Sequence, residues 1–393
     1  MQVQCEFAGL AAYDPSFCSI GFLKHGAVEW PRSMQSDFPV LNGWQGVAHL
    51  KKLFAAAVGV EDSQRVFVAN QTAKLVRIAA RVMARQCHRV MTTDLSWPAW
   101  QCIVAEEAVR HGREIIQVSI SDAVMQRRWT ADDIVNQLAS AYIEKRCDGL
   151  FLPAVSSLGI LFPVTQLAEQ LRGQSEVRFV LVDAAQAFGQ IPLSSMTKCC
   201  DVLVTGCHKW LGAHLPMGVA VAGNSLAAEQ FRCVVSGIDE SRFCSDPLLL
   251  LTEQLQSDDV KRYAETVNIV PMLAASAALS SGQAAPVNSR SEFSQRLANS
   301  DRAAECLSGS SWNPVRLNQT TRSAILLAAS NHAAVQQTAP DTLQTHFRNH
   351  GIALSAYSGG LLRMSMPLGI MQQSHLDFLS SAFHAVSHHC RSK

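Results

Sequence analysis

The sequence predicts an α/β protein, with a mostly parallel sheet in a large domain and a smaller α+β domain after it. Two observations support this fold class. Short apolar runs suited to buried strands alternate with longer amphipathic stretches. The chain of 393 residues also exceeds the usual size of a single hydrophobic core. The seven predicted strands of the large domain are residues 65–69, 89–92, 114–118, 149–153, 178–183, 201–205 and 218–222.

Helices are expected between these strands. Apolar residues recur there at three- and four-residue spacing, which places them on one helix face. The clearest predicted helices are residues 72–85, 97–111, 130–145 and 164–172. Strands that alternate with helices favour a parallel sheet, because each helix returns the chain to the same edge of the sheet.

The alternation weakens after residue 222, where the second part of the chain begins. A helix-like stretch over residues 260–281 leads into a segment rich in Gly, Ala, Pro and Ser. We therefore predict an N-terminal segment (1–21), a large domain (22–260), a linking helix and linker (261–290) and a small domain (291–393). In the small domain, residues 323–329 and 361–366 are predicted strands and residues 374–386 a closing helix.

Composition excludes several classes of partner. Lys plus Arg (33) nearly equals Asp plus Glu (32), and no basic run is present, so nucleic acid and anionic membranes are not expected partners. A small-molecule partner fits better. The N-terminus lacks a signal-peptide pattern and no apolar run approaches a membrane span, which predicts a cytoplasmic protein. The 12 cysteines, which lack CxxC spacing, are expected to be reduced.

Two histidine pairs have the spacing that places both imidazoles on one helix face. They are His346 with His350, and His384 with His388. Neither pair has the glutamate of an HExxH motif. We therefore predict no metal site.

The residues that carry chemistry follow two neighbouring predicted strands. Asp183 comes at the end of one strand, where α/β sheets place ligand-binding groups, although such an Asp is more often a helix cap or turn residue. His208 and Lys209 follow the next strand. A random His-Lys pair is usually exposed, but Trp210 and Leu211 favour a partly enclosed lysine. Burial lowers the pKa of a lysine and makes it nucleophilic toward an aldehyde.

Together, the segments around Asp183 and Lys209 indicate one protein family far more specifically than either segment does alone. Asp183-Ala-Ala-Gln186, followed by Thr205-Gly-Cys-His208-Lys209-Trp210, resembles the class V aminotransferase superfamily of pyridoxal 5'-phosphate (PLP) enzymes. Residues 22–32 are similar to the N-terminal signature of its isopenicillin N epimerase branch, and the cysteine desulfurases are also similar. The resemblance spans about residues 22–379. It implies the aspartate-aminotransferase-like fold (fold type I), with PLP as cofactor.

The resemblance implies roles for the central residues. Lys209 would be the Schiff-base lysine, Asp183 would pair with the pyridinium nitrogen, and Gln186 would bind the phenolic oxygen of the cofactor. These roles are physically reasonable. A carboxylate beside the ring nitrogen keeps it protonated, so that the ring withdraws electrons from the substrate, and the freed lysine can then move protons.

Further residues are implied to hold the phosphate. Gln71 and Thr72 lie where a strand turns into a helix, whose amino end can accept an anion. Asn70 and Gln71 replace the family's usual glycine and first threonine, so only Thr72 matches directly, and an ordinary helix N-cap is the alternative. Thr205 and His208 match phosphate-contacting positions. Thr266 matches the segment that a neighbouring subunit contributes, which implies a homodimer with sites at the subunit interface. Here Glu265 replaces a glycine, and an ordinary helix start is the alternative.

The resemblance implies other contacts with the cofactor or substrate only through the positions of residues in the sequence. Trp97 is the candidate to stack on the cofactor ring, with a core anchor as the alternative for both Trp97 and Trp100. Ser156 and Ser157 lie in the loop expected beneath the ring, and either serine is a candidate to face it. Arg363 corresponds to the carboxylate-binding arginine, unless it forms a salt bridge within the small domain. The remaining candidates for contact with an amino-acid substrate are Lys24, His25 and Tyr357.

The sequence leaves the reaction open. Transamination, epimerisation, and β- or γ-elimination or replacement, including carbon–sulfur cleavage, all begin with loss of the α-proton to Lys209. Persulfide-forming desulfurase chemistry is disfavoured, because residues 350–360 contain no cysteine. A non-catalytic or regulatory protein of the same fold is the alternative. A dinucleotide-binding oxidoreductase is disfavoured, since the chain lacks the GxGxxG turn.

Overall fold

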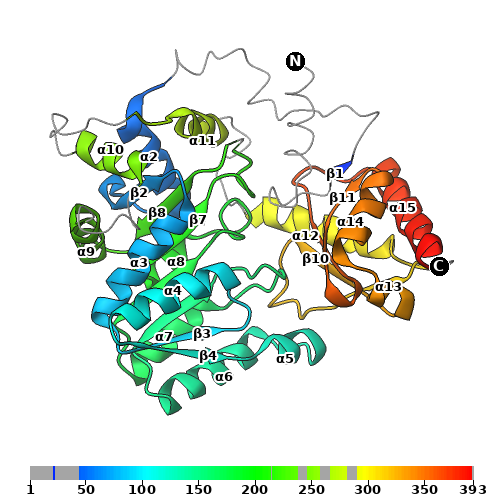
Figure 1. Cartoon of the computed structure of the whole chain (residues 1–393), viewed down its shortest axis with the longest axis horizontal. Coiled ribbons are helices and arrows are strands. Elements are labelled where there is room, and N and C mark those ends of the chain that lie inside the picture. The colour runs from blue at the N-terminus through cyan, green and yellow to red at the C-terminus, as the bar shows by residue number, and fades with distance from the viewer. Residues whose placement is uncertain are drawn as a thin grey trace.

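A seven-stranded sheet forms the centre of the larger part of the molecule (Figure 1). The computed structural model describes residues 21–22, 44–213, 215–237, 246–256, 266–280 and 290–391. The strand order is β2-β8-β7-β6-β5-β3-β4, and all neighbours are parallel except the two pairs that involve β8. The strands are β2 (Val66–Ala69), β3 (Arg89–Thr93), β4 (Glu114–Val118), β5 (Gly149–Pro153), β6 (Phe179–Asp183), β7 (Val202–Gly206) and β8 (Gly218–Ala222). The predicted strands and the mostly parallel sheet are confirmed.

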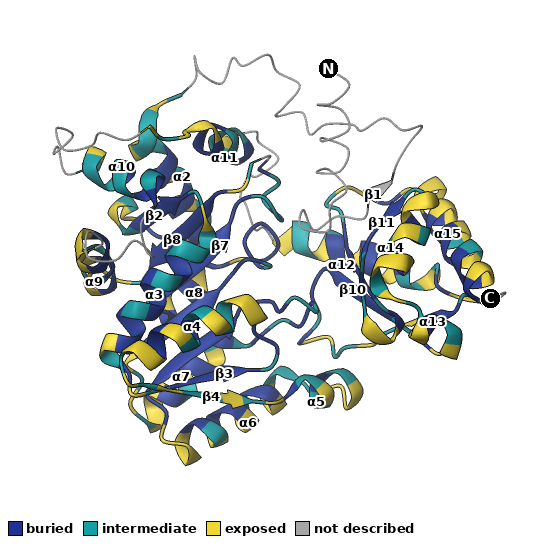
Figure 2. Ribbon diagram, viewed as in Figure 1, coloured by how far each residue is buried: buried dark blue, intermediate teal, exposed yellow. Residues whose placement is uncertain are grey.

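The central strands are mostly apolar because both faces of the sheet are covered. In β6, Val180 and Val182 belong to one buried cluster, whereas Phe179 and Leu181 belong to another. Successive side chains of a strand point to opposite faces, so this alternation serves two cores at once. Figure 2 shows the sheet as buried, apart from the edge strand β4, and the outer faces of the surrounding helices as exposed.

Helices cover the two faces of this sheet, and the four predicted ones are confirmed as α3, α4, α6 and α7, with ends shifted by up to two residues. Thr130 and Asp133 form a capping box at the start of α6, which satisfies backbone N–H groups that have no partner within the helix. The helices of this part are α2 (Gly46–Val58), α3 (Thr72–Gln86), α4 (Pro98–Arg110), α5 (Ser121–Gln126), α6 (Ala131–Glu144), α7 (Val164–Gln174), α8 (Ser194–Cys199), α9 (Ser225–Ser236), α10 (Pro247–Gln256) and α11 (Val270–Ser280).

One predicted element is wrong in its extent. Of the expected helix over residues 260–281, the structure describes residues 266–280; α11 is helical, and residues 266–269 are not. Pro271 explains the late start, because proline has no N–H and is tolerated only in the first turn of a helix. The side chain of Asn268 accepts a hydrogen bond from the N–H of Val270 at 3.1 Å and so caps the new helix.

The smaller part is built on an antiparallel sheet of order β12-β13-β10-β9. The predicted strands of this part are confirmed as β10 and β13, and the closing helix as α15. A separate antiparallel pair, β1 with β11, joins residues 21–22 near the N-terminus to residues 352–353 of the smaller part. The elements are β1 (Gly21–Phe22), α12 (Arg290–Glu305), β9 (Trp312–Pro314), β10 (Ile325–Ser330), α13 (Ala333–Gln337), α14 (Pro340–Asn349), β11 (Ile352–Ala353), β12 (Ser355–Tyr357), β13 (Leu361–Ser365) and α15 (Gln373–Arg391).

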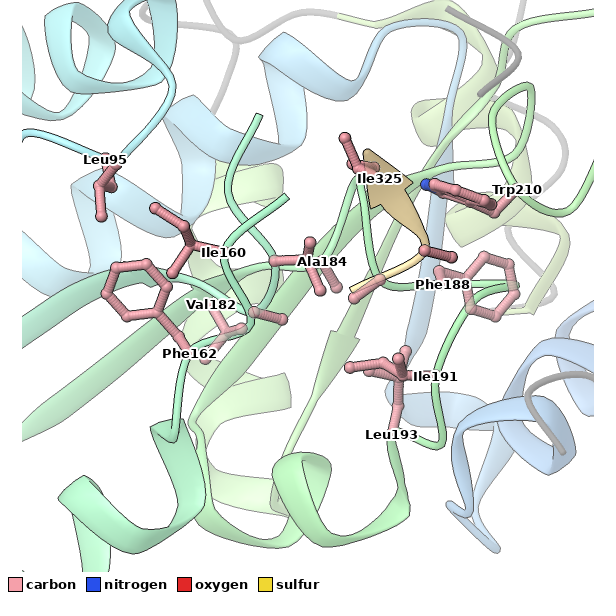
Figure 3. Close-up of a cluster of buried hydrophobic side chains, with 14 of the residues drawn as sticks. Leu95, Ile160, Phe162, Val182, Ala184, Phe188, Ile191, Leu193, Trp210 and Ile325 are labelled. Carbon is pink, nitrogen blue, oxygen red and sulfur yellow. The ribbon is translucent and has the colours of Figure 1, made fainter. Parts of the chain in front are cut away.

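The two parts share packing. Ile325 of β10 lies in the same buried cluster as Ile160, Val182 and Ala184 (Figure 3). A Cβ on Gly159 would approach the Cβ of Ile325 to 2.6 Å, so the two segments are in direct contact. The predicted boundary between a large and a small domain at residues 261–290 stays a prediction. The buried cluster contains residues from both sides of this boundary. Among the described helices, none combines the length and the apolar character needed to cross a bilayer.

Candidate active site

A pocket of about 250 Å³ opens between the two parts, at the carboxyl ends of β5 and β6. It collects side chains that are distant in the sequence, because parallel strands end at the same edge of a sheet. β12 and β13 of the smaller part close the other side. The lining residues are Trp97, Trp100, Pro153, Val155, Ser157, Asp183, Ala185, Gln186, Lys209, Ser355, Tyr357 and Arg363.

Asp183 is the buried acidic residue of this pocket. It pairs with Val204 of β7 in the parallel ladder, and its Oδ1 accepts the N–H of Ala185 at 2.9 Å. Burial raises the pKa of Asp183, against the charge of Lys209, the Ala185 N–H and a side-chain hydrogen bond from Trp100. A buried carboxylate of this kind is stabilised by a cation placed beside it. A protonated ring nitrogen would meet that need.

Lys209 reaches the pocket from a tight turn after β7. The turn is held by hydrogen bonds from the Gly212 N–H to the Lys209 carbonyl and from the Ala213 N–H to the Cys207 carbonyl, each 3.0 Å long. Lys209 is half-buried. Asp183 and Lys209 therefore line the same pocket, as expected from two adjacent strands.

Arg363 brings a cation from the opposite side. It is the third residue of β13 and only 4% exposed. Its Nη2 donates to the Oε1 of Gln186 at 3.0 Å, and the Nε1 of Trp210 donates to the same oxygen at 3.0 Å. Tyr357, which pairs with Leu361 across β12 and β13, lies on the same pocket wall. The structure thus brings together Gln186, Arg363 and Tyr357.

The amino end of α3 forms a cradle that suits a phosphate. Thr72 is its first residue, and a Cβ on Gly218 would lie 2.7 Å from the Thr72 backbone nitrogen. A Cβ on Gly206 would lie 3.2 Å from the His208 Nδ1 and 3.3 Å from the Thr72 Oγ1. The absence of a Cβ at these glycines therefore lets Thr72 and His208 approach the backbone of β7 and β8 closely. Backbone N–H groups at a helix start bind phosphate well, so the cradle fits this group of PLP.

Asp246 is a feature of this cradle that sequence reasoning missed. Its carboxylate accepts the backbone N–H groups of Asn70 at 3.1 Å and Gln71 at 3.2 Å, and it also caps α10 through the N–H of Leu248. The N–H of Gln71 is thus bonded to a protein carboxylate. The available signal was Asp246-Pro247, since Asp before Pro is typical of a helix start.

Other candidates lie elsewhere. Ser157 rather than Ser156 lines the pocket, because the Oγ of Ser156 is buried and accepts the Ile160 N–H at 3.1 Å. The hydroxyl of Thr205 donates to the Ala184 carbonyl at 3.2 Å, within the sheet. Thr266 is exposed. Lys24 and His25 lie outside the described residues.

Both tryptophans at the start of α4 line the pocket, so they are more than core anchors. Trp97 is 44% exposed, whereas Trp100 donates to Asp183. The histidine pairs of α14 and α15 do not line this pocket, and His346 instead contacts His389, with ring centroids 4.3 Å apart.

Comparison with known proteins identifies the family of the chain. Residues 41–362 match the family model described as aminotransferase class-V. A search of curated proteins finds no match.

Similar solved structures cover most of the chain. Ureidoglycine–glyoxylate aminotransferase from Bacillus subtilis is 13% identical, with 92% of this chain and 89% of that chain covered and a TM-score of 0.65. The cysteine desulfurase CsdA from Escherichia coli is 16% identical, with 91% and 87% covered and a TM-score of 0.66. C-DES, solved with glycine covalently linked to PLP, is 14% identical, with 97% and 98% covered and a TM-score of 0.67. The fold is that of PLP enzymes of fold type I, and the chain belongs to the class V aminotransferase family of PLP-dependent enzymes.

Proposed function

We propose that this enzyme acts on an α-amino acid, with Lys209 as the residue that holds PLP and then moves the α-proton of the substrate. One observation carries the proposal: Lys209, Asp183 and Arg363 line a single pocket. An amine, a buried carboxylate and a guanidinium are the groups that this chemistry needs. The cradle formed by Thr72 and His208 supports the same assignment, because it suits the phosphate of the cofactor.

Each residue has a distinct task in this proposal. When bound, PLP withdraws electrons from the substrate and so weakens the bond to the α-proton. Asp183 stabilises positive charge at the ring nitrogen, because it is a buried carboxylate. The Nζ of Lys209 removes the α-proton as a general base. Arg363 binds the substrate carboxylate, for which the planar fork of a guanidinium is well suited.

We further propose that the reaction is transamination, epimerisation, or elimination or replacement, rather than persulfide formation on a cysteine of this chain. None of the described residues that line the pocket is a cysteine. Cys207, two residues before Lys209, is fully buried, and burial raises the pKa of its thiol. The similar structures include a cystine C–S lyase as well as aminotransferases, so both chemistries belong in the test.

The assembly and location rest on the sequence. We propose a homodimer with Thr266 near the partner subunit, and a cytoplasmic enzyme with a small-molecule substrate. Light scattering of the purified protein tests the dimer: a monomeric mass at micromolar concentration would contradict it.

Lys209→Ala tests the function directly. We expect PLP to give the purified protein visible absorbance, and borohydride reduction to attach it to Lys209, as read by peptide mass spectrometry. Lys209→Ala should lose this attachment, because the amine is absent. Lys198→Ala removes an exposed lysine and should retain it. Attachment elsewhere, or none, would contradict the proposal.

The reaction is then read from a panel of amino acids. Keto-acid formation would indicate transamination, inversion at the α-carbon would indicate epimerisation, and ammonia or sulfide release would indicate elimination. A protein that binds PLP on Lys209 but turns over none of the panel would favour the non-catalytic alternative.

A further inference from the structure

Trp210 directly follows Lys209, and its indole N–H bonds to Gln186. Its Nε1 donates to the Gln186 Oε1 at 3.0 Å, and the same oxygen accepts the Arg363 Nη2 at 3.0 Å. Both lengths are typical of good N–H···O hydrogen bonds. One amide oxygen thus joins the segment after β7 to β13 of the smaller part.

The chemistry of the partners determines which end of the Gln186 amide faces them. An indole N–H and a guanidinium are donors only, so both require the carbonyl oxygen. If Gln186 turned its amide around, its NH₂ group would face two donors. The Trp210 N–H therefore favours the orientation in which Oε1 also accepts from Arg363.

Trp210 is itself held firmly. The guanidinium of the buried Arg296 lies over its ring, 4.9 Å from the centroid. Its backbone is pressed against Gly189, where a Cβ would approach the Trp210 carbonyl carbon to 2.5 Å. Figure 3 shows Trp210 with Phe188 at the edge of the buried cluster. The indole N–H is thus a preorganised donor.

We propose that Trp210 is a positioning residue that holds Arg363, through the amide of Gln186, ready for the carboxylate of the substrate. This inference rests on the proposed role of Arg363. Arginine loses much side-chain freedom when it is fixed, and a partner that fixes it beforehand reduces that loss on binding. Loss of the indole N–H should weaken carboxylate recognition and leave cofactor chemistry intact.

The test compares two probes on the PLP-loaded enzyme. Aminooxyacetate carries a carboxylate, whereas methoxyamine has the same reactive group without one. Each reacts with bound PLP, which is followed as loss of visible absorbance. The ratio of the two rate constants measures carboxylate recognition. In Trp210→Phe we expect this ratio to fall about tenfold, as for loss of a hydrogen bond coupled to a charged group, with the methoxyamine rate within about twofold.

Controls separate positioning from packing. Trp129→Phe changes a half-buried tryptophan that lines a different cavity, and its ratio should equal that of the wild type. Gln186→Met removes the shared acceptor and should lower the ratio by itself, which tests the link even where Trp210→Phe does not fold. If Trp210 acts through Gln186, adding Trp210→Phe to Gln186→Met should have little further effect.

Several results would overturn the inference. An unchanged ratio in Trp210→Phe or in Gln186→Met would do so, and so would additive effects in the double variant. If the enzyme still reacts with methoxyamine while giving one of these results, only the inference about Trp210 is refuted, and the proposed function stands. A protein that neither binds PLP nor reacts with methoxyamine refutes the proposed function, and the inference with it.

A measurement on the cofactor-free protein is independent of turnover. With ¹⁵N-labelled tryptophan, the indole N–H of Trp210 is identified by its absence from the spectrum of Trp210→Phe. In Gln186→Met, its hydrogen exchange should quicken about tenfold or more, because its acceptor is gone. Unchanged exchange would show that the bond does not hold the indole.

Discussion

At Asp183, burial and neighbouring groups shift the pKa in opposite directions. Its burial raises its pKa, and the hydrogen bonds from Ala185 and Trp100 act in the other direction. Both of these partners are donors, so they favour the ionised carboxylate. These donors oppose the effect of burial, but the pKa of Asp183 still lies above its usual value. A cation bound beside the carboxylate would stabilise its ionised form.

Asp183→Asn should therefore impair the chemistry more than cofactor attachment. The neutral amide stabilises a protonated ring nitrogen less, so loss of the substrate α-proton should slow about 100-fold or more. The rate of α-hydrogen exchange in D₂O, with an amino acid that the panel identifies, measures this step. Asp122→Asn, an exposed change, is the control. Exchange within a few-fold of the wild-type rate in Asp183→Asn would contradict the assignment.

At the scale of elements, α3 presents its amino end to the site and is anchored by a buried ion cluster along its length. Arg77 and Arg81 of α3 bond the fully buried Glu107 of α4 at 3.1 and 3.0 Å. Arg110 adds a third bond at 2.9 Å. Burial alone would raise the pKa of Glu107, but the bonds from Arg81 and Arg77 outweigh it and the pKa is lowered.

Glu107→Gln should destabilise the protein by about 2 kcal/mol at pH 7, because Arg77 and Arg81, whose side chains are only 15% and 13% exposed, lose a charged hydrogen-bond partner. A carboxyl with a lowered folded pKa stabilises the protein above its unfolded pKa, about 4.3, and that contribution is lost as pH falls through the folded value. The difference from wild type should therefore shrink in acid.

Urea unfolding at pH 7 and at a series of pH values below about 4 measures this difference. The matched control is Glu106→Gln, because Glu106 also bonds Arg77, at 2.8 Å, but its side chain is 52% exposed. It should change stability by less than about 1 kcal/mol. Equal losses in both variants would show that the buried cluster contributes nothing special.

For the whole molecule, the main question is how the two parts are held so that Arg363 faces Lys209. The buried Gln190 contributes: its Oε1 accepts the Ala324 N–H at 2.8 Å, and its Nε2 donates to the Gln186 carbonyl at 2.6 Å. Arg296 donates to the Met366 carbonyl at 3.1 Å and to the Gly189 carbonyl at 3.4 Å. The turn after β6 therefore carries both a site residue and the contacts with the smaller part.

Gln190→Ala should loosen this junction. The Ala324 N–H loses its buried acceptor, so its hydrogen exchange should quicken about tenfold or more. Exchange resolved by peptide mass spectrometry measures the segment ahead of β10. Gln166→Ala, which removes an exposed bond to Asp132, should leave it unchanged. Unaltered exchange in Gln190→Ala would show that other contacts hold the junction.

The sequence by itself determined the strands of the large sheet and four of its helices, and it predicted the pair Asp183 and Lys209, which the structure places in one pocket. These follow from local signals: apolar periodicity, and motifs within a few residues of one another. Local signals wrongly predicted a continuous helix across Pro271, although a proline is tolerated only in the first turn of a helix.

Only the tertiary structure decided which distant side chains meet. Asp246 reaches the N–H of Asn70 across 176 positions, and Arg363 reaches Gln186 across 177. Ser157, rather than Ser156, faces the pocket because of the turn that holds Ile160. Such contacts depend on how packed elements place side chains in space. The spacing of apolar residues does not predict these contacts, because each partner fits the pattern of its own helix, strand or turn whether or not the other is present.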